Sequence, residues 1–77
     1  MKELAEYIAR SLVDNPDEVE VREFVSGRNA DLELSVAKND MGRVIGKRGR
    51  VANSIRALLR VAAEREGKKV SLDIMEP

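Results

Sequence analysis

The sequence predicts an α+β domain in which a three-stranded mixed sheet is covered on one face by three helices. Two observations lead to this prediction. In three segments the apolar residues recur every three or four positions, which is typical of amphipathic helices. In three other segments they alternate with polar residues, which is typical of strands. The order along the chain is helix, strand, strand, helix, helix, strand, and each element has one apolar face to bury against the others.

The first half of the chain predicts a helix followed by a β-hairpin. Leu4, Ile8 and Leu12 recur every four residues, and Asp14-Asn15-Pro16 then ends the helix. The turn residues Ser26-Gly27-Arg28-Asn29 separate two alternating segments and predict an antiparallel pair. Phe24 falls out of phase with its strand, which predicts a bulge or an exposed ring. The alternating apolar positions of the two strands are Val19, Val21, Leu32, Leu34 and Val36.

The second half predicts two helices and a final strand. Lys38-Asn39-Asp40 offers capping side chains for a short helix over residues 41–45, which ends at Gly46. A longer helix is predicted from about Arg50 to Glu66, before Gly67. Its apolar stripe is Val51, Ile55, Leu58, Leu59 and Ala62, and the last strand alternates at Val70, Leu72 and Ile74. Because this strand returns through helices, a parallel partner is expected.

The composition limits the possible functions. A chain of 77 residues is too short for two cores, so a single domain over residues 1–77 is predicted. Cysteine and histidine are absent, which excludes disulfides, thiol and imidazole chemistry and ordinary zinc sites. We therefore expect no metal and no redox chemistry. The sequence also offers no catalytic constellation, so no cofactor, no small-molecule substrate and no catalysis are expected. Neither a membrane-spanning run nor a secretory signal is recognisable, so a cytoplasmic location is expected.

The positive charges are concentrated in the middle of the chain, although the formal net charge is zero. Residues 41–63 contain no Asp or Glu, whereas most acidic residues lie in the first 40. Such a cluster can neutralise phosphates within a Debye length of about 8 Å at physiological salt. The simpler interpretation is the solvated face of a helix, which we retain for Arg56 and Arg60, with a protein interface as the other possibility. The six basic residues of the cluster are Arg43, Lys47, Arg48, Arg50, Arg56 and Arg60.

A loop rich in glycine and basic residues separates the two predicted helices. Gly46 and Gly49 lack a Cβ atom, so they allow a sharp bend and a close approach of a ligand to the backbone. Lys47 and Arg48 lie between them and add positive charge, and the next helix begins near Arg50. This chemistry fits a sugar-phosphate backbone.

In this context the sequence resembles a type II KH domain, whose GXXG loop clamps a backbone of four nucleotides. The resemblance covers nearly the whole chain. The segments Asp40 to Arg50 and Ile55 to Leu59 are similar to those of the small, stand-alone KH-domain RNA-binding proteins of bacteria. Such proteins are thought to be cytoplasmic RNA chaperones or post-transcriptional regulators, and in some bacteria they are linked to cell elongation and cell-wall homeostasis.

The resemblance also implies partners and site residues. The partners would be single-stranded RNA and a protein, either a second copy in a homodimer or a larger KH-containing partner, protein B, in a heterodimer. The loop residues would contact the RNA backbone, with arginines on both sides and an apolar pair lining a groove for the bases. The implied RNA-binding residues are Gly46, Lys47, Arg48, Gly49, Arg43, Arg50, Val44 and Ile45.

Three alternatives follow from the same residues. Two helices joined by a basic turn could form a helix-turn-helix that enters a DNA major groove. A protein-interaction adaptor could use the same fold without needing Lys47 and Arg48. A nucleotide-binding P-loop fits poorly, because three residues rather than four separate Gly42 from Gly46 and Arg48 replaces the expected Ser or Thr.

Overall fold

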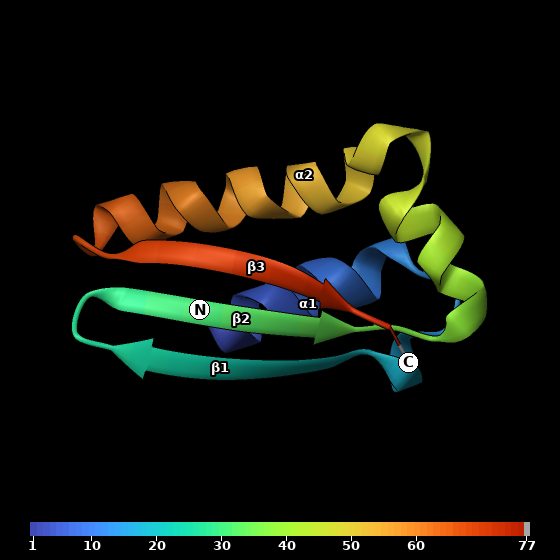
Figure 1. The fold of residues 1–77 in the computed structure, drawn as a ribbon, viewed down its shortest axis with the longest axis horizontal. Helices are drawn as coiled ribbons and strands as arrows, with labels where there is room; N and C mark the ends of the chain where they lie inside the picture. The colour runs from blue at the N-terminus through green and yellow to red at the C-terminus, as the bar shows by residue number, and fades with distance from the viewer. Residues whose placement is uncertain (77) are drawn as a thin grey trace.

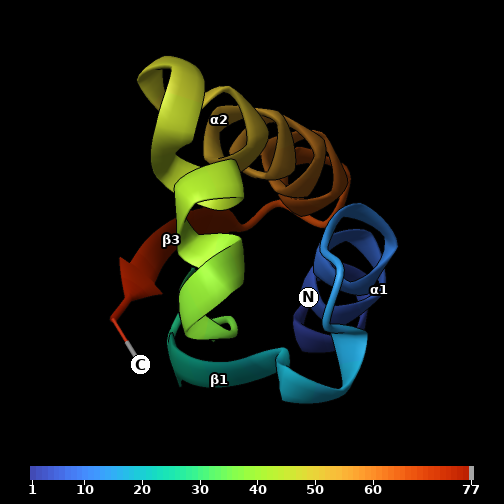
Figure 2. The same cartoon turned by 90° about the vertical axis from the view of Figure 1, so that its right-hand side faces the viewer.

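The computed structural model describes residues 1–76, apart from the side chain of Lys47. The elements follow the predicted order, with helices packed on one side of a three-stranded sheet (Figures 1 and 2). Short 3-10 turns precede the first strand and the long helix. The elements are α1 (Lys2–Leu12), η1 (Pro16–Glu18), β1 (Glu20–Ser26), β2 (Asn29–Ser35), η2 (Lys38–Asp40), α2 (Met41–Arg65) and β3 (Lys69–Met75).

The helix α2 consists of two segments that run in different directions. Its backbone leaves helical geometry at Arg48, with φ 64°, and at Gly49, with φ 70°. Figures 1 and 2 show the ribbon turning sharply there, where its colour changes from green to yellow. The helix that precedes the bend and the helix that follows it are the two helices predicted from the sequence, so the order α-β-β-α-α-β is confirmed.

The sheet is mixed, as predicted. Strand β2 is central, antiparallel to β1 and parallel to β3. Ser26 pairs with Asn29, so the hairpin turn contains only two residues. The register continues without interruption past Phe24, and the predicted bulge is therefore wrong. The ring of Phe24 is 53% exposed, which confirms the other expectation for this residue.

The core lies between the sheet and the helices, and it corrects the predicted stripe of α2. Leu58 is 53% exposed, although it was expected to face the core. The buried residues of this part of α2 recur at spacings of three, four and four, and Leu58 lies about 100° around the helix from its buried neighbour. These buried residues are Ala52, Ile55, Leu59 and Ala63.

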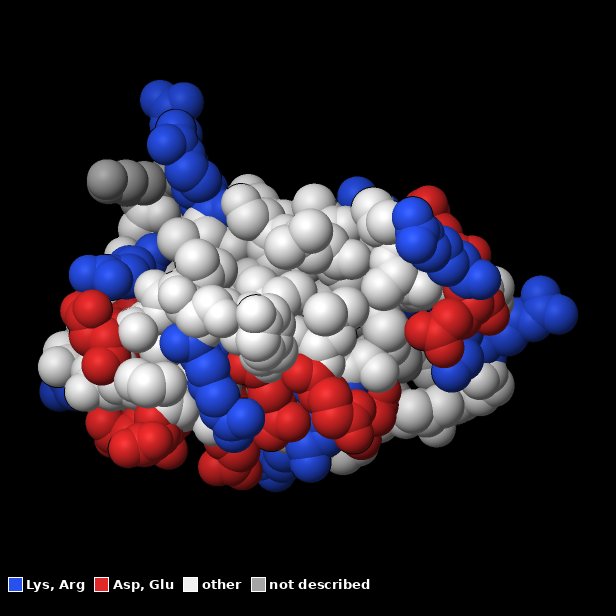
Figure 3. Space-filling model, turned by 180° about the vertical axis from the view of Figure 1, so that it is seen from behind, with Lys and Arg blue, Asp and Glu red and all other residues white. Residues whose placement is uncertain are grey.

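One broad face of the protein is formed by helices rather than by the sheet. Seen from the side of α1, this face has a central area without charged residues, and acidic and basic side chains surround that area (Figure 3). Exposed apolar side chains of the helices include Tyr7, Leu58 and Val61. Within residues 1–76, the structure contains no helix that combines the length and apolar character needed to cross a membrane.

Candidate nucleic-acid interface

The loop at residues 46–49 is the bend between the two segments of α2. Arg48 adopts a left-handed backbone conformation, with φ 64°, which costs an L-residue with a side chain roughly 1–2 kcal/mol. Gly49 follows with φ 70°, where glycine carries no such penalty. Two successive left-handed residues change the direction of the helix, and the Arg48 side chain is exposed. Such local strain occurs preferentially at functional sites.

Gly46 differs from Gly49, because the fold does not require a glycine there. Its φ angle is not positive, and a Cβ atom at this position would meet no atom within 4 Å outside its own stretch of helix, among the residues that the structure describes. Glycine inside a helix is less stable than alanine by about 1 kcal/mol. Neither backbone geometry nor packing explains Gly46, whereas the close approach of a ligand would.

The basic side chains beside the loop are exposed. Arg48 and Arg50 line an open hollow of about 410 Å³ together with Asn53, Ser54 and Ala57. Among the described side chains neither arginine forms an ion pair. The backbone of Lys47 belongs to the same bend, and its side chain lies outside the described part of the structure. This surface therefore presents positive charge to solvent.

Arg43 has a carboxylate partner, unlike Arg48 and Arg50. Its Nη2 atom lies 3.1 Å from Oδ2 of Asp14, in the segment that follows α1. The two side chains are 50% and 68% exposed. Arg43 also lines a second hollow of about 320 Å³ with Gly42, Arg50 and Val51, between the two segments of α2.

The two apolar residues before the loop have different surroundings. Val44 is 1% exposed and belongs to the core, so its implied contact with RNA bases is not possible in this structure. Ile45 is 51% exposed and lines an open hollow of about 510 Å³ with Lys38, Met41 and Glu76. Consecutive residues of a helix point about 100° apart, and this explains why one of the pair packs inward and the other outward.

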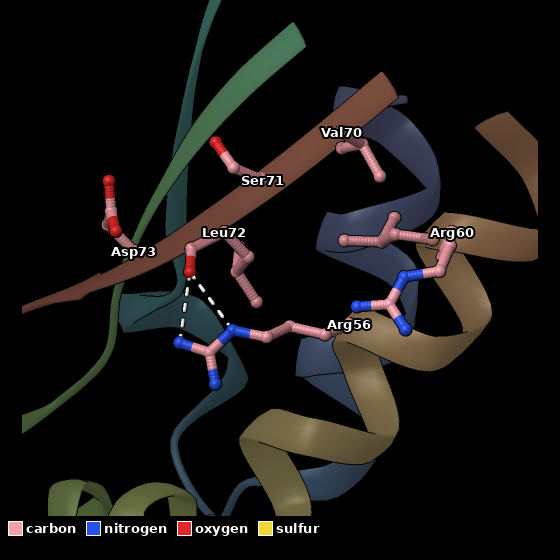
Figure 4. Close-up of a pocket in the computed structure, with 7 residues that line it drawn as sticks. Arg56, Arg60, Val70, Ser71, Leu72 and Asp73 are labelled. Carbon is pink, nitrogen blue, oxygen red and sulfur yellow. Dashed lines mark hydrogen bonds between the residues drawn. The ribbon is translucent and has the colours of Figure 1, made fainter. Parts of the chain in front are cut away.

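Arg56 crosses from the second segment of α2 to the edge of β3. Its Nε and Nη2 atoms donate hydrogen bonds of 3.1 and 3.0 Å to the carbonyl oxygen of Leu72, and Nη1 donates to Oδ1 of Asn53. Figure 4 shows this contact in a hollow of about 340 Å³ between α2 and β3, with Arg60 one turn further along α2. Arg56 is half-buried and bonded to β3, so the expected solvated position is wrong for Arg56, while Arg60 is exposed as expected. The other expectation, a protein interface, stays a prediction for both.

Sequence reasoning missed this contact, because no pattern along the chain relates α2 to the edge of β3. The positive charge of Arg56 was visible in the sequence, but its acceptor is a backbone carbonyl 16 residues away. The hydrogen bonds tie the side chain of Arg56 to the strand, in addition to the core packing of Ile55 and Leu59 against Leu72.

Asp40 anchors the start of α2, although not by the predicted capping. No side-chain hydrogen bond caps α2, and the Asp40 carboxylate instead accepts bonds from the segment after α1. Oδ1 accepts from the backbone N–H of Asp14 at 3.1 Å, and Oδ2 accepts from the backbone N–H and Nδ2 of Asn15 at 3.0 and 3.1 Å. Its carboxylate is therefore already engaged and unable to cap the helix.

These contacts determine the ionisation of Asp40, which is only 1% exposed. Burial by itself raises the pKa of the carboxyl group. The hydrogen bonds from Asn15 and Asp14, together with the nearby positive charge of Arg43, outweigh burial and leave the pKa below its ordinary value. Asp40 is consequently a charged group inside the structure, stabilised by its donors.

Comparison with known proteins gives consistent matches over nearly the whole chain. The sequence model of the family described as KhpA/KhpB, KH domain, matches residues 2–74. The chain is 52% identical over 75 residues to the RNA-binding protein KhpA of Clostridium acetobutylicum, covering 97% of this chain and 100% of that protein. It is 47% identical over 76 residues to the protein of the same name from Halalkalibacterium halodurans, covering 99% and 100% respectively.

A solved structure also shares the fold. A crystal structure of Era from Aquifex aeolicus, bound to GDP·AlF4⁻, superposes with a TM-score of 0.72 at 21% sequence identity. The match covers 97% of this chain and 29% of the Era chain. A second Era structure, in complex with MgGDPNP and nucleotides 1506–1542 of 16S ribosomal RNA, matches equally well. At this level of identity the likeness supports the arrangement of helices and strands only.

Proposed function

Because the chain belongs to the KhpA/KhpB KH-domain family, we propose that it binds single-stranded RNA and holds the sugar-phosphate backbone with residues 46–49. One observation carries this proposal, namely the exposed left-handed bend at Arg48 and Gly49 between two helical segments. A bend packed away from solvent, or neutralised by carboxylates, would argue against it. The bend is instead open, and the described side chains of Arg48 and Arg50 form no ion pair.

The remaining site residues are proposed to have separate roles. Arg48 and Arg50 would neutralise phosphates together with Lys47, while Gly46 would let the RNA backbone come close to the helix. Ile45 supplies exposed apolar surface for a base, and Val44 supports it from the core. The only aromatic residues, Tyr7 and Phe24, lie outside the basic cluster, so base stacking on a ring is not expected there. We therefore expect a modest sequence preference. No catalysis is expected, because the chain lacks Cys and His and offers no catalytic constellation.

A charge-reversal experiment tests the proposal. The double variant Lys47→Glu/Arg48→Glu is expected to lose retention of single-stranded RNA in a gel shift, while its thermal unfolding curve stays close to that of the wild type, because exposed loop substitutions change stability by less than about 0.5 kcal/mol. The matched control is Arg28→Glu/Lys69→Glu. It changes the net charge equally at the hairpin end of the sheet, away from the bend in Figure 1.

The outcomes separate the proposal from its alternatives. Equal loss of RNA in both double variants would indicate a nonspecific charge effect and contradict the loop clamp. Unchanged RNA binding by the folded loop variant would contradict the loop clamp and favour the alternative of a protein-interaction adaptor. Stronger competition by duplex DNA than by single-stranded RNA would instead favour the helix-turn-helix mode.

We also propose that the protein acts in the cytoplasm as an RNA chaperone or post-transcriptional regulator. A KH domain that contacts only four nucleotides neutralises few phosphates, so one domain binds RNA weakly and reversibly. Weak, reversible binding suits transient action on many RNAs. Acceleration of the annealing of complementary RNA strands would test the chaperone role. The resemblance to stand-alone bacterial KH proteins further suggests a link to cell elongation and cell-wall homeostasis, testable by measuring cell length after deletion of the gene.

We further propose that the chain pairs with a second KH domain. The partner would be a second copy or a larger KhpB-type protein, and the family's shared KhpA/KhpB domain supports this pairing. Two linked domains would double the contacts with RNA and raise the avidity. Sedimentation of the purified chain over a range of concentrations tests self-association, and co-purification with the larger protein tests the mixed pair.

A further inference from the structure

The ion pair between Arg43 and Asp14 connects the basic surface to an acidic residue outside it. The Nη2–Oδ2 distance is 3.1 Å, and both side chains are at least half exposed. An exposed pair of this kind contributes little to stability, since water and salt ions compete for both charges. The pair can therefore open without disturbing the fold.

The fold nevertheless holds Asp14 in place beside Arg43. The backbone N–H of Asp14 donates to Oδ1 of the buried Asp40 at 3.1 Å, and the next residue, Asn15, donates twice to Oδ2. Asp14 is thus fixed through its backbone by a residue that is adjacent to α2 and 26 positions further along the chain. Its carboxylate is presented to Arg43 by tertiary structure.

Arg43 is also placed to meet a ligand of the loop. It lines the hollow of about 320 Å³ between the two segments of α2, and Arg50 lies on the other side of the same hollow. A phosphate there would pair with the Arg43 guanidinium, which the Asp14 carboxylate now pairs with at 3.1 Å. The two anions would compete for one donor group and repel each other.

We propose that Asp14 is an affinity-determining residue, whose carboxylate competes with an RNA phosphate for the guanidinium of Arg43. This inference rests on the proposed RNA-binding function and adds to it a residue from outside the basic cluster. RNA that reaches the hollow must displace Asp14, so the wild-type protein binds more weakly than its arginines alone would allow. Removal of the carboxylate is therefore a gain-of-function change.

The test compares two isosteric substitutions in the same segment. Asp14→Asn removes the competing charge and keeps the backbone N–H that Asp40 accepts, while Asp17→Asn removes an exposed carboxylate three residues later. We expect Asp14→Asn to tighten binding of a single-stranded RNA oligonucleotide about two- to fivefold, clearly more than Asp17→Asn. The slope of log affinity against log salt should also steepen by about 0.7, the value for one additional phosphate contact.

A double-variant cycle excludes a general charge effect. In the background of Arg43→Gln, the gain in RNA affinity caused by Asp14→Asn should no longer exceed the gain caused by the control Asp17→Asn. The inference would be overturned if Asp14→Asn and Asp17→Asn raised the RNA affinity equally. It would also be overturned if Asp14→Asn still raised the affinity more than Asp17→Asn in the absence of Arg43. Thermal unfolding confirms that each variant is folded, and Asp14→Ser serves as a second substitution if the asparagine variant is not.

Failure of this inference can be told apart from failure of the proposed function. If charge reversal at Lys47 and Arg48 abolishes RNA binding, but Asp14→Asn does not raise the RNA affinity above that of Asp17→Asn, only the inferred competition between Asp14 and RNA for Arg43 is wrong. If charge reversal at the loop has no effect on RNA binding, the proposed clamp fails, and the competition fails with it.

Discussion

Asn15 donates two hydrogen bonds to a single oxygen of Asp40, one from its backbone N–H at 3.0 Å and one from its side-chain amide at 3.1 Å. Asp40 is almost completely buried, and Asn15 lies 25 residues before it. The pair joins the end of α1 to the beginning of α2, the helix that carries the candidate RNA-binding loop. It links the acidic first half of the chain to the basic second half.

The substitution Asp40→Asn should destabilise the fold. An amide places an NH2 group where the carboxylate now accepts, so at least one partly buried donor of Asp14 or Asn15 loses its partner. We expect the midpoint of thermal unfolding to fall by at least about 4 °C at neutral pH. The control Asp17→Asn, at an exposed position, should change the midpoint much less, and an equal effect of both would contradict the role of Asp40.

The stability contributed by Asp40 should depend on pH in a defined direction. Because the pKa of the carboxyl group is lower in the folded protein, ionised Asp40 stabilises the fold above the pKa of the unfolded chain. This contribution is lost as the pH falls from about 4 through the lower pKa of the folded state. Unfolding midpoints measured between pH 7 and pH 2 should therefore show the wild type and Asp40→Asn converging in acid. A difference that stays constant over this range would show that the charge of Asp40 plays no part.

Substitution of Gly46 should separate folding from RNA binding. Gly46→Ala replaces glycine by a better helix former in open space, so the free energy of unfolding should stay the same or rise by up to about 1 kcal/mol. The added Cβ atom should nevertheless weaken RNA binding, because it stands where the RNA backbone is proposed to approach. Denaturant unfolding and a gel shift measure the two effects. Unaltered RNA affinity would mean that Gly46 is not a point of close approach.

Gly49 should behave in the opposite way. Its φ of 70° is unfavourable for alanine, so Gly49→Ala should lower the free energy of unfolding by about 1–2 kcal/mol. Comparison of the two alanine variants by the same denaturant titration checks this difference. If both variants were equally stable, the left-handed bend would not be a property of the folded protein in solution.

Arg56 should contribute to stability through its hydrogen bonds rather than through its charge. Arg56→Lys keeps the positive charge but cannot reproduce both bonds to the Leu72 carbonyl, and we expect a loss of about 1–2 kcal/mol. Arg60→Lys, the same change on an exposed side chain one turn later, should stay within about 0.5 kcal/mol of the wild type. Urea unfolding of the two variants measures the difference, and equal stabilities would show that the contact with β3 is weak.

The order of helices and strands, the hairpin turn and the position of the loop could all be predicted, because they depend on periodicity and on residues close together in the chain. Glycines and cations at 46–50 lie in one short segment, so their placement at one bend could be predicted. The same local reasoning failed within a single helical turn at Leu58, which is exposed beside the buried Leu59. The choice between facing the core and facing solvent depends there on a rotation of about 100° between neighbouring residues.

Which charges meet could not be predicted in this way, because it depends on how the folded elements pack together. The tertiary structure paired Asp14 with Arg43, directed the Asp40 carboxylate toward Asn15 rather than toward the end of its own helix, and brought Arg56 to the carbonyl of Leu72. These partners are 16 to 29 residues apart, and ion pairs and hydrogen bonds act over a few ångströms, so they exist only after the chain has folded. A sequence pattern records which charges are available, whereas packing determines which of them remain exposed to a ligand.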